Sequence, residues 1–415
     1  MTVLQTVILV LNVIAVLTVP SRYALVPILF GCVYMAYGSC VDIGSFSFNA
    51  VRILITSGYL RIILRREMIK SRFLMLDKIM LIWAIWIIIS STLHPGTNPL
   101  VFNLGQAYNI AGMYFLMRIL INNSDVDVII SAIAVLLVPI AIEMIHEQKT
   151  GKNYFALLGI SCEQLELRNG GFRARGPFAH AILAGNVGAT CLPMIVGIHS
   201  NFIVLSIFGT CACLIMVITS ASSGPMISLC TSLFALYLWK HKYYARVLPY
   251  LACLIYILLE ALMTRPAYYV ISKIDLAGGS TGWHRARLIE MAIQHIDEWW
   301  LAGTNYTRHW MSSGVSWSPN HSDITNYYIL MGVWGGLPLM FIYITMLVCG
   351  YTYVRKASND LLQQADCKKY MAWCLGAALF SHTFATLSVA YFDQSYIFLI
   401  LCLSCLSRIV TFKTD

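Results

Sequence analysis

Residues 126–145 read Val-Asp-Val-Ile-Ile-Ser-Ala-Ile-Ala-Val-Leu-Leu-Val-Pro-Ile-Ala-Ile-Glu-Met-Ile, a run in which only Asp127 and Glu143 are charged. Such a run has the length that a helix needs to cross a membrane, about twenty residues. Similar runs recur along the 415-residue chain, which is 59% hydrophobic and 11% charged. Soluble domains carry roughly a quarter charged residues, so the composition excludes a water-soluble globule and a disordered chain. It predicts an all-α polytopic membrane protein.

The apolar runs predict 12–13 transmembrane helices with two long polar loops between them. The expected spans lie near residues 2–19, 23–40, 46–64, 75–93, 99–120, 126–145, 178–198, 201–219, 222–239, 244–263, 322–350, 370–390 and 393–410. The loops divide the chain into five parts: N-terminal transmembrane helices 1–145, a first loop 146–177, central transmembrane helices 178–263, a large loop 264–321 and C-terminal transmembrane helices 322–415.

Basic residues in the short loops indicate the sidedness, because cytoplasmic loops carry an excess of Lys and Arg. Four segments agree on one orientation, with the basic residues Arg61, Arg65, Arg66, Lys70, Arg72, Lys240, Lys242, Arg246, Arg355, Lys356, Lys368, Lys369, Arg408 and Lys413 inside. Both long loops then face outward, although they too carry several Lys and Arg. Two interpretations of these outward arginines stay open, a solvated loop surface and a site for an anion.

The first motif is Arg173-Ala-Arg175-Gly-Pro-Phe-Ala-His180, directly before an expected span. Gly-Pro is typical of the point where a loop passes into a helix. The arginines therefore lie beside a helix N-terminus, where the positive dipole end and free N–H groups favour a phosphate. Arginine near a membrane interface also often extends toward the headgroups without binding a ligand.

The second motif is Trp283-His284-Arg285-Ala-Arg287-Leu-Ile-Glu290, in the large loop. From Trp283 onward the spacing predicts a short amphipathic helix, with Ser280 or Thr281 as its cap. Its expected apolar face consists of Ile289, Ala292, Ile293 and Ile296, and Trp299 and Trp300 follow at an interfacial position. Such a helix presents Arg285 or Arg287 at the depth of the headgroups. Alternatively, Arg287 simply pairs with Glu290.

The third motif is Asn320-His321-Ser-Asp323, which opens a long apolar helix. A histidine at a helix start is often a capping or core residue. Its unperturbed pKa of about 6.5 also suits a general base, and the two arginine-bearing loops favour that role for His321.

These three motifs, in this order, resemble the O-antigen ligase and O-antigen polymerase superfamily of bacterial envelope glycosyltransferases. Arg173, Gly176 and Phe178 match its Arg-x-x-Gly-x-Phe pattern, and the interval from Arg285 to Leu301-Ala-Gly303 matches its second motif. The step from His321 to Gly332 matches the third. The match covers residues 170 to 336. It departs from the pattern where Trp283-His284 separates the glycine from the arginine, and at Ser322, where Asn is usual.

The resemblance implies a GT-C-like membrane fold in the bacterial inner membrane, with the active site facing the periplasm. It implies a polyprenyl-diphosphate-linked glycan as donor and a sugar hydroxyl of a second glycan as acceptor. Guanidinium groups of Arg173, Arg175, Arg285 and Arg287 would stabilise the leaving diphosphate, and His321 would deprotonate the acceptor. Supporting roles fall to Asp323, Asn320, His284, Glu290 and Trp283. We expect inversion at the anomeric carbon, no metal ion and no cofactor.

Several functions stay open from the sequence. The motifs favour an exopolysaccharide or O-antigen polymerase, and a ligase that joins the glycan to lipid A core shares the same donor chemistry. A transporter or flippase of lipid-linked glycan would carry charges inside its spans and often a repeated half, neither of which is evident. A non-catalytic scaffold is the third class. The expected partners are the donor, the acceptor, the lipid bilayer and other envelope polysaccharide-assembly proteins, and we expect no nucleic acid.

Overall fold

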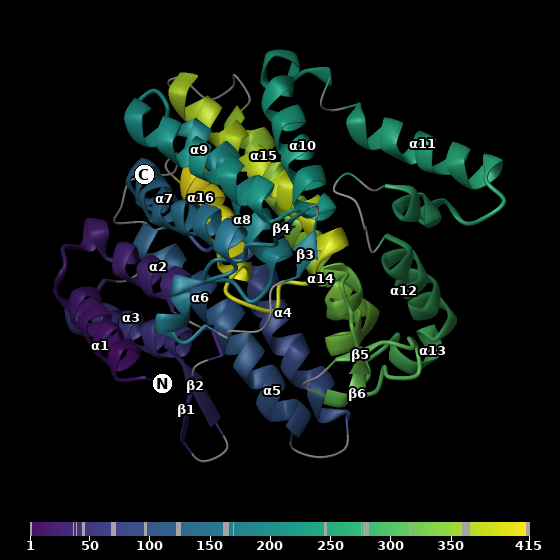
Figure 1. The fold of residues 1–415 in the computed structure, drawn as a ribbon, viewed down its shortest axis with the longest axis horizontal. Coiled ribbons are helices and arrows are strands. Elements are labelled where there is room, and N and C mark those ends of the chain that lie inside the picture. Colours follow the sequence, from purple (N-terminus) through teal and green to yellow (C-terminus); the bar gives the residue numbers. More distant parts are fainter. Residues whose placement is uncertain are drawn as a thin grey trace.

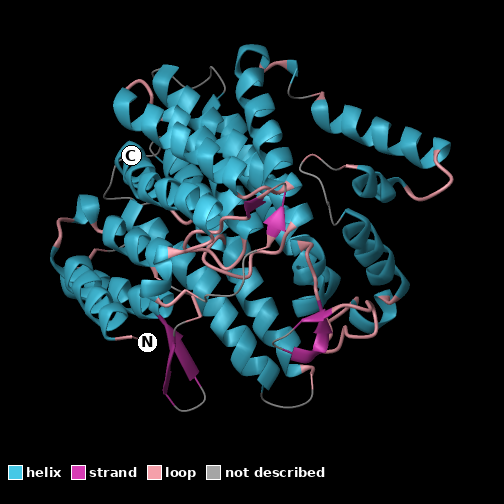
Figure 2. Ribbon diagram, viewed as in Figure 1, coloured by secondary structure: helices cyan, strands magenta, loops and turns pink. Residues whose placement is uncertain are grey.

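A computed structural model describes residues 2–35, 37–38, 40–43, 46–67, 72–94, 98–121, 126–160, 166–168, 170–244, 247–274, 276, 282–315, 318–358 and 366–411. Within these residues the chain folds into helices, together with three antiparallel two-stranded hairpins (Figure 2). The predicted all-helical class is therefore confirmed, and the strands are confined to short connections. Residues 277–281, which include the predicted caps Ser280 and Thr281, lie outside the described residues.

The N-terminal part begins at the lower left of the molecule in Figure 1. Its elements are α1 (Val3–Thr18), α2 (Leu25–Tyr34), β1 (Cys40–Ile43), β2 (Phe46–Asn49), α3 (Ala50–Arg65), α4 (Met75–Thr92), α5 (Asn98–Ala107), a π-helical turn (Tyr108–Gly112), α6 (Met113–Ile121) and α7 (Val126–Thr150). The segment expected as a third span at 46–64 thus begins as a strand. The physical reason is a cap, because the Asn49 side chain accepts a hydrogen bond from the Arg52 backbone N–H at 2.9 Å.

The central part contains the β3 and β4 hairpin and the helices that follow it. Its elements are β3 (Leu167–Arg168), β4 (Gly171–Phe172), α8 (Ala181–Gly197), α9 (Ile203–Thr219), α10 (Ser223–Tyr237), α11 (Leu248–Leu262) and a 3-10 helix η6 (Ala267–Lys273). Helix α11 has no buried residue and stands apart from the bundle (Figure 1).

The C-terminal part returns the chain to the bundle. Its elements are α12 (Gly282–Gln294), α13 (Ile296–Trp299), β5 (Gly314–Val315), β6 (Ser318–Ser322), α14 (Tyr327–Ser358), α15 (Asp366–Ser388) and α16 (Tyr396–Thr411). Helix α14 starts later than the expected residue 322 because the Asn326 side chain caps it, accepting from the Tyr328 N–H at 2.9 Å. It bends at Gly335 and Gly336, where Gly336 has a φ of +74°, a conformation that glycine adopts without strain.

Within the part of the chain that the structure describes, three helices are by themselves long and apolar enough to cross a membrane: α4, α7 and α14. Helix α11 and η6, bent by 90° at their junction, form a fourth candidate when taken together. Five further apolar helices are shorter, with bounds Val3–Thr18, Ser21–Tyr34, Ala181–Gly197, Ile203–Thr219 and Tyr396–Val410. Their lengths and compositions are those of a helical membrane protein. The predicted count of 12–13 spans stays a prediction.

The two long loops of the sequence meet at one end of the helical bundle, since Arg173 of the first donates to the Ser222 hydroxyl at 2.8 Å and the Leu276 N–H of the second donates to the Ser223 hydroxyl at 3.2 Å. Here the loop before α8 is joined to the loop before α16, since the Ala179 N–H donates to Asp393 at 2.9 Å and Gln394 donates to the Pro177 carbonyl at 2.8 Å. Arg173 reaches Ser222 at the start of α10. The opposite end carries a pocket lined by residues such as Asp127, where α7 starts, and Ile409 near the end of α16. The candidate site lies at the first end.

Candidate functional site

The Glu147 carboxylate, fully buried near the end of α7, fixes the loop that carries the first motif. One oxygen accepts hydrogen bonds from the backbone N–H groups of Arg175 and Gly176, at 2.9 and 2.8 Å. The other oxygen accepts from the Asn153 side chain at 2.8 Å. Gly176 has a φ of +54°, which lets the chain turn here without strain. The result is a rigid turn that sends both arginine side chains over the end of the bundle.

Arg173 is buried against the start of α10. One guanidinium nitrogen forms an ion pair with Glu166, whose side chain is exposed, and another donates to the Ser222 hydroxyl at 2.8 Å. Ser222 is the N-cap of α10. A cation at this end of a helix faces the positive end of the helix dipole. The position therefore favours an additional anion.

The ion pair between Arg173 and Glu166 persists at neutral pH. Burial alone raises the pKa of Glu166, but the hydrogen bond and the charge of Arg173 outweigh it and leave the pKa below its ordinary value. Burial lowers the pKa of Arg173, and Glu166 opposes that change. Since the ordinary pKa of an arginine lies far above neutral pH, both groups stay charged.

Arg285, in the first turn of α12, is the second predicted arginine that reaches this end. Its Nε donates to the Ser388 carbonyl at 2.9 Å, at the last residue of α15. Burial lowers its pKa, and the positive charges of Arg168 and Arg173 lower it further. The structure thus brings Arg173 and Arg285, which are far apart in the sequence, within electrostatic reach of each other.

Two basic residues that were not predicted as site residues complete the cluster. Arg168, on β3, donates to the Ala221 carbonyl at 3.1 Å. His180 caps α8, its Nδ1 accepting from the Ile182 N–H at 3.1 Å. Burial, followed by the charges of arginines such as Arg173, lowers its pKa to about 4, so this imidazole is neutral at pH 7. The motif 173–180 contains His180, whereas no sequence pattern marks Arg168. We call Arg168, Arg173, Arg175, His180 and Arg285 the arginine cluster.

Arg287 faces elsewhere. It forms an ion pair with Glu290, and the same carboxylate accepts a hydrogen bond from the Tyr269 hydroxyl at 2.7 Å. Side chains two positions apart in an α-helix point about 200° away from each other. Arg287 and Arg285 therefore lie on nearly opposite sides of α12. The i,i+3 ion pair of Arg287 and Glu290 that the sequence allowed is therefore present. Trp283 is exposed.

The third motif approaches the cluster through Asp323. Its carboxylate lies 4.0 Å from Nε2 of His284. Its negative charge raises the pKa of Arg285, against the larger effects that lower it. His321, on β6, is half-buried with Nδ1 2.7 Å from the Ser318 hydroxyl, and burial lowers its pKa. The Asn320 carbonyl accepts from two backbone N–H groups, those of Thr307 and Arg308, at 3.0 Å each, which is a structural role.

The expected amphipathic helix is present as α12, but its buried face differs from the predicted one. The buried residues are Gly282, Arg285, Ala286, Leu288, Met291 and Ala292. Ile293 and Ile296 are exposed, as is Trp300. Trp299 of α13 is buried instead, its indole donating to the Ala292 carbonyl at 2.9 Å, because α13 packs on α14 through this ring and Val333. The prediction for Trp299 as an interfacial residue was wrong.

Comparison with known protein families finds no matching family model, and no curated protein matches the chain. A proposal of function therefore rests on the motifs and on the geometry of the described residues. Of the four predicted arginines, Arg173, Arg175 and Arg285 lie in one cluster. Arg287 forms its ion pair with Glu290 on another side of α12.

Replacing Glu147 with alanine should destabilise the protein strongly. The substitution leaves the buried N–H groups of Arg175 and Gly176 without their acceptor, at a cost of about 1–3 kcal/mol for each such group. We expect a loss of about 2–6 kcal/mol in the free energy of unfolding, measured by chemical denaturation in detergent. Lys149→Ala, at an exposed position on the same helix, is the matched control and should change stability by less than about 0.5 kcal/mol. Equal effects of the two substitutions would contradict the role of Glu147.

Proposed function

We propose that this chain is a membrane glycosyltransferase that polymerises a glycan from a polyprenyl-diphosphate donor at the periplasmic face of the bacterial inner membrane. The observation that carries the proposal is the convergence of the buried guanidinium groups of Arg173 and Arg285 with that of Arg168. Like charges gathered in a buried place repel each other, so their arrangement is costly unless an anion binds. The three-motif resemblance supplies the identity of that anion, a lipid-linked diphosphate.

The helix termini around the cluster fit the same ligand. Helices α8 and α10 both begin at this end of the bundle, with His180 and Ser222 as their N-caps. Helix N-termini attract phosphate through their dipoles and free N–H groups, and guanidinium groups bind phosphate oxygens in pairs. Fixed donors of this kind stabilise the charge that develops as the leaving group departs.

In the proposed reaction, the acceptor hydroxyl oxygen attacks the anomeric carbon of the donor. The bond from that carbon to the diphosphate oxygen breaks, its electron pair stays on the diphosphate, and the arginine cluster stabilises the charge. The acceptor proton passes to an imidazole. Attack from the side opposite the leaving group inverts the anomeric carbon, and the chemistry uses no metal ion and no cofactor.

His321 is our first candidate for the base, and His284 is the second. The resemblance favours His321, which is half-buried and held by Ser318. The geometry around the cluster favours His284, because it adjoins Arg285 in the chain and lies beside the Asp323 carboxylate. A carboxylate beside an imidazole stabilises the imidazolium that forms when the base takes a proton.

Transport without chemistry is less well supported. The buried ion pair of Asp77 and Arg118, 3.5 Å apart, joins the first turn of α4 to the last turn of α6. Transporters place such charges near the centres of their spans, whereas this pair lies at helix ends. The chemistry at the donor is common to polymerase and ligase, so the acceptor is what separates them.

Removing the arginine cluster should abolish transfer. Single substitutions Arg173→Ala and Arg285→Ala should each lower the turnover of purified lipid-linked donor by about 100-fold or more, the range for loss of one donor to a developing charge. Arg287→Ala is the matched control, being the same change two positions along α12, and should leave turnover close to that of the wild type. Turnover and polymer length are measured on protein with an unchanged unfolding midpoint. The proposal fails if Arg285→Ala is active, or if Arg287→Ala is as inactive as Arg285→Ala.

The pH profile should identify the base. A general base works in its neutral form, so the rate should rise with pH through the pKa of the base and then level off. For His321, burial puts that pKa below the ordinary 6.5. His321→Gln should lower the rate by about 10²-fold or more and remove the acidic limb, while His284→Gln should keep that limb. The reverse pattern would assign the base to His284, and an unchanged profile in both variants would exclude an imidazole base.

Deleting the gene should leave a diagnostic glycan on the lipid carrier. A polymerase deletion should accumulate a single repeat unit on the periplasmic side, measured by mass spectrometry of extracted lipid-linked glycan. A full-length chain left on the carrier would indicate the ligase. Repeat units confined to the cytoplasmic leaflet would indicate a flippase and contradict the proposed reaction.

A further inference from the structure

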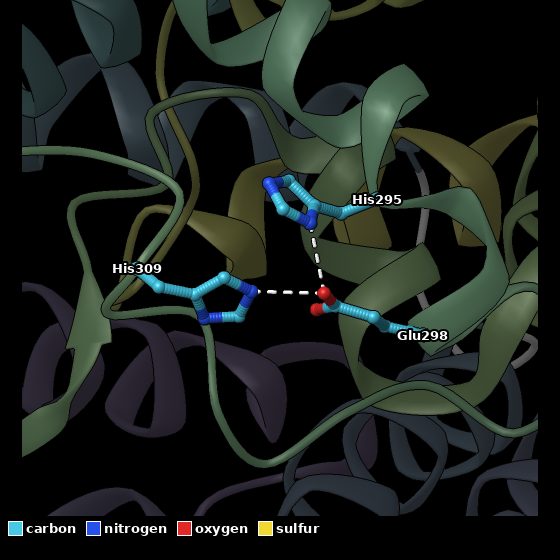
Figure 3. A group of neighbouring side chains, drawn as sticks. All are labelled: His295, Glu298 and His309. Carbon is cyan, nitrogen blue, oxygen red and sulfur yellow. Dashed lines mark hydrogen bonds and ion pairs between the residues drawn. The ribbon is translucent and has the colours of Figure 1, made fainter.

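His295, Glu298 and His309 converge on one point at the far end of α12 from Arg285 (Figure 3). Nδ1 of His295 lies 2.8 Å from Oε1 of Glu298, and Nε2 of His309 lies 2.9 Å from the same oxygen. The three ligand atoms all lie within 4.8 Å of one another. Within the described residues, no other group of three histidine, cysteine or acidic side chains converges in this way.

The backbone around each of the three residues is fixed before any ion binds. The His295 N–H donates to the Met291 carbonyl at 3.0 Å, and the Glu298 N–H donates to the His295 carbonyl at 3.1 Å. The turn that carries His309 is closed by the Trp310 N–H, which donates to the Thr307 carbonyl at 3.0 Å.

The side chains are held from the outside as well. The buried Trp310 indole donates to Oε2 of Glu298 at 3.1 Å, which leaves Oε1 directed at the two imidazoles. The His295 ring is stacked on Trp310 and the His309 ring on Tyr306, with interplanar angles of 9° and 13°. Outer contacts of this kind orient metal ligands in known sites.

We propose that His295, Glu298 and His309 form a binding site for a divalent transition-metal ion of the Zn²⁺ type. Two imidazole nitrogens and one carboxylate oxygen are a common Zn²⁺ donor set, with bonds of about 2.0–2.2 Å. Tetrahedral bonds of that length separate the ligand atoms by about 3.3 Å, so the two contacts between histidine and Glu298, now 2.8 and 2.9 Å, need only a small opening. Glu298 and His309 are exposed, which gives the ion and a fourth ligand from solvent access to the site.

The ion acts on the fold of the large loop and not on the arginine cluster. It clamps the turn around His309 to the junction of α12 and α13, at the rim of a small core that includes Trp299 and Val333. From Arg285 to His295, a helix rises about 15 Å. The proposal is thus independent of the glycosyl transfer reaction, which involves the opposite end of α12.

Zn²⁺ binding to the full-length, tag-free protein in detergent tests this site. Isothermal titration calorimetry against a competing chelator should give one ion per chain in the wild type. His309→Ala and Glu298→Gln should each weaken Zn²⁺ binding by about 100-fold or more. His199→Ala, which removes an exposed histidine between α8 and α9, is the matched control and should bind Zn²⁺ like the wild type. Cobalt substitution should give the visible absorption of a tetrahedral site in the wild type and the control only.

Two results would overturn the proposal. One is a wild type that binds no Zn²⁺ in competition with the chelator, which would leave the three side chains as a hydrogen-bonded clasp. The other is Zn²⁺ binding that survives unchanged in both His309→Ala and Glu298→Gln, which would place the ion elsewhere. Because both positions are exposed, their variants are expected to fold, and an unchanged unfolding midpoint without Zn²⁺ verifies this.

Discussion

The hydrogen bonds from the Arg175 and Gly176 backbone to the buried Glu147 carboxylate set the geometry of the whole site. A carboxylate removed from water is costly unless hydrogen bonds compensate it, and Asn153 supplies a further donor. The contact turns the chain across the end of the bundle directly after the β3 and β4 hairpin. This turn places Arg173 and Arg175 beside α8 and α10. Glu147, a single acidic side chain on α7, thus positions the basic groups of the loop before α8.

The arginine cluster is destabilising for the folded protein. Arg173 and Arg285 are both buried, which lowers the pKa of each, and the positive charge of Arg168 lowers both pKa values further. The ion pair with Glu166 offsets part of this cost for Arg173. The Ser388 carbonyl at the end of α15 accepts a hydrogen bond from Arg285. A chain selected for stability alone has no need to gather these charges. Under the proposed function, the arrangement is a binding surface whose repulsion is relieved when an anion occupies it.

Composition was sufficient to predict the helical membrane class, because repeated apolar runs of about twenty residues are typical of membrane-spanning helices and rare in soluble proteins. The site was predictable only in part. The motif 173–180 marked Arg173 and Arg175 through Gly-Pro at the loop-to-helix boundary, but Glu147 and Arg168 take part through tertiary contacts that leave no pattern in the sequence. The buried face of α12 was predicted wrongly since helical periodicity groups apolar residues without saying which neighbour covers them. Arg285 is on the protein-facing side, and Ile293 is exposed.

Helix α12 connects the two groups of functional interest in the large loop. Arg285 lies in its first turn, and His295 follows its last residue, Gln294. Near that far end, Trp299 packs closely against Gly332 of α14, with a spacing that would exclude a larger residue. This packing fixes the far end of the α12 and α13 segment against α14. A clamp formed by His295, Glu298 and His309 strengthens that end without touching the anion, which separates the task of holding the helix from the task of binding charge.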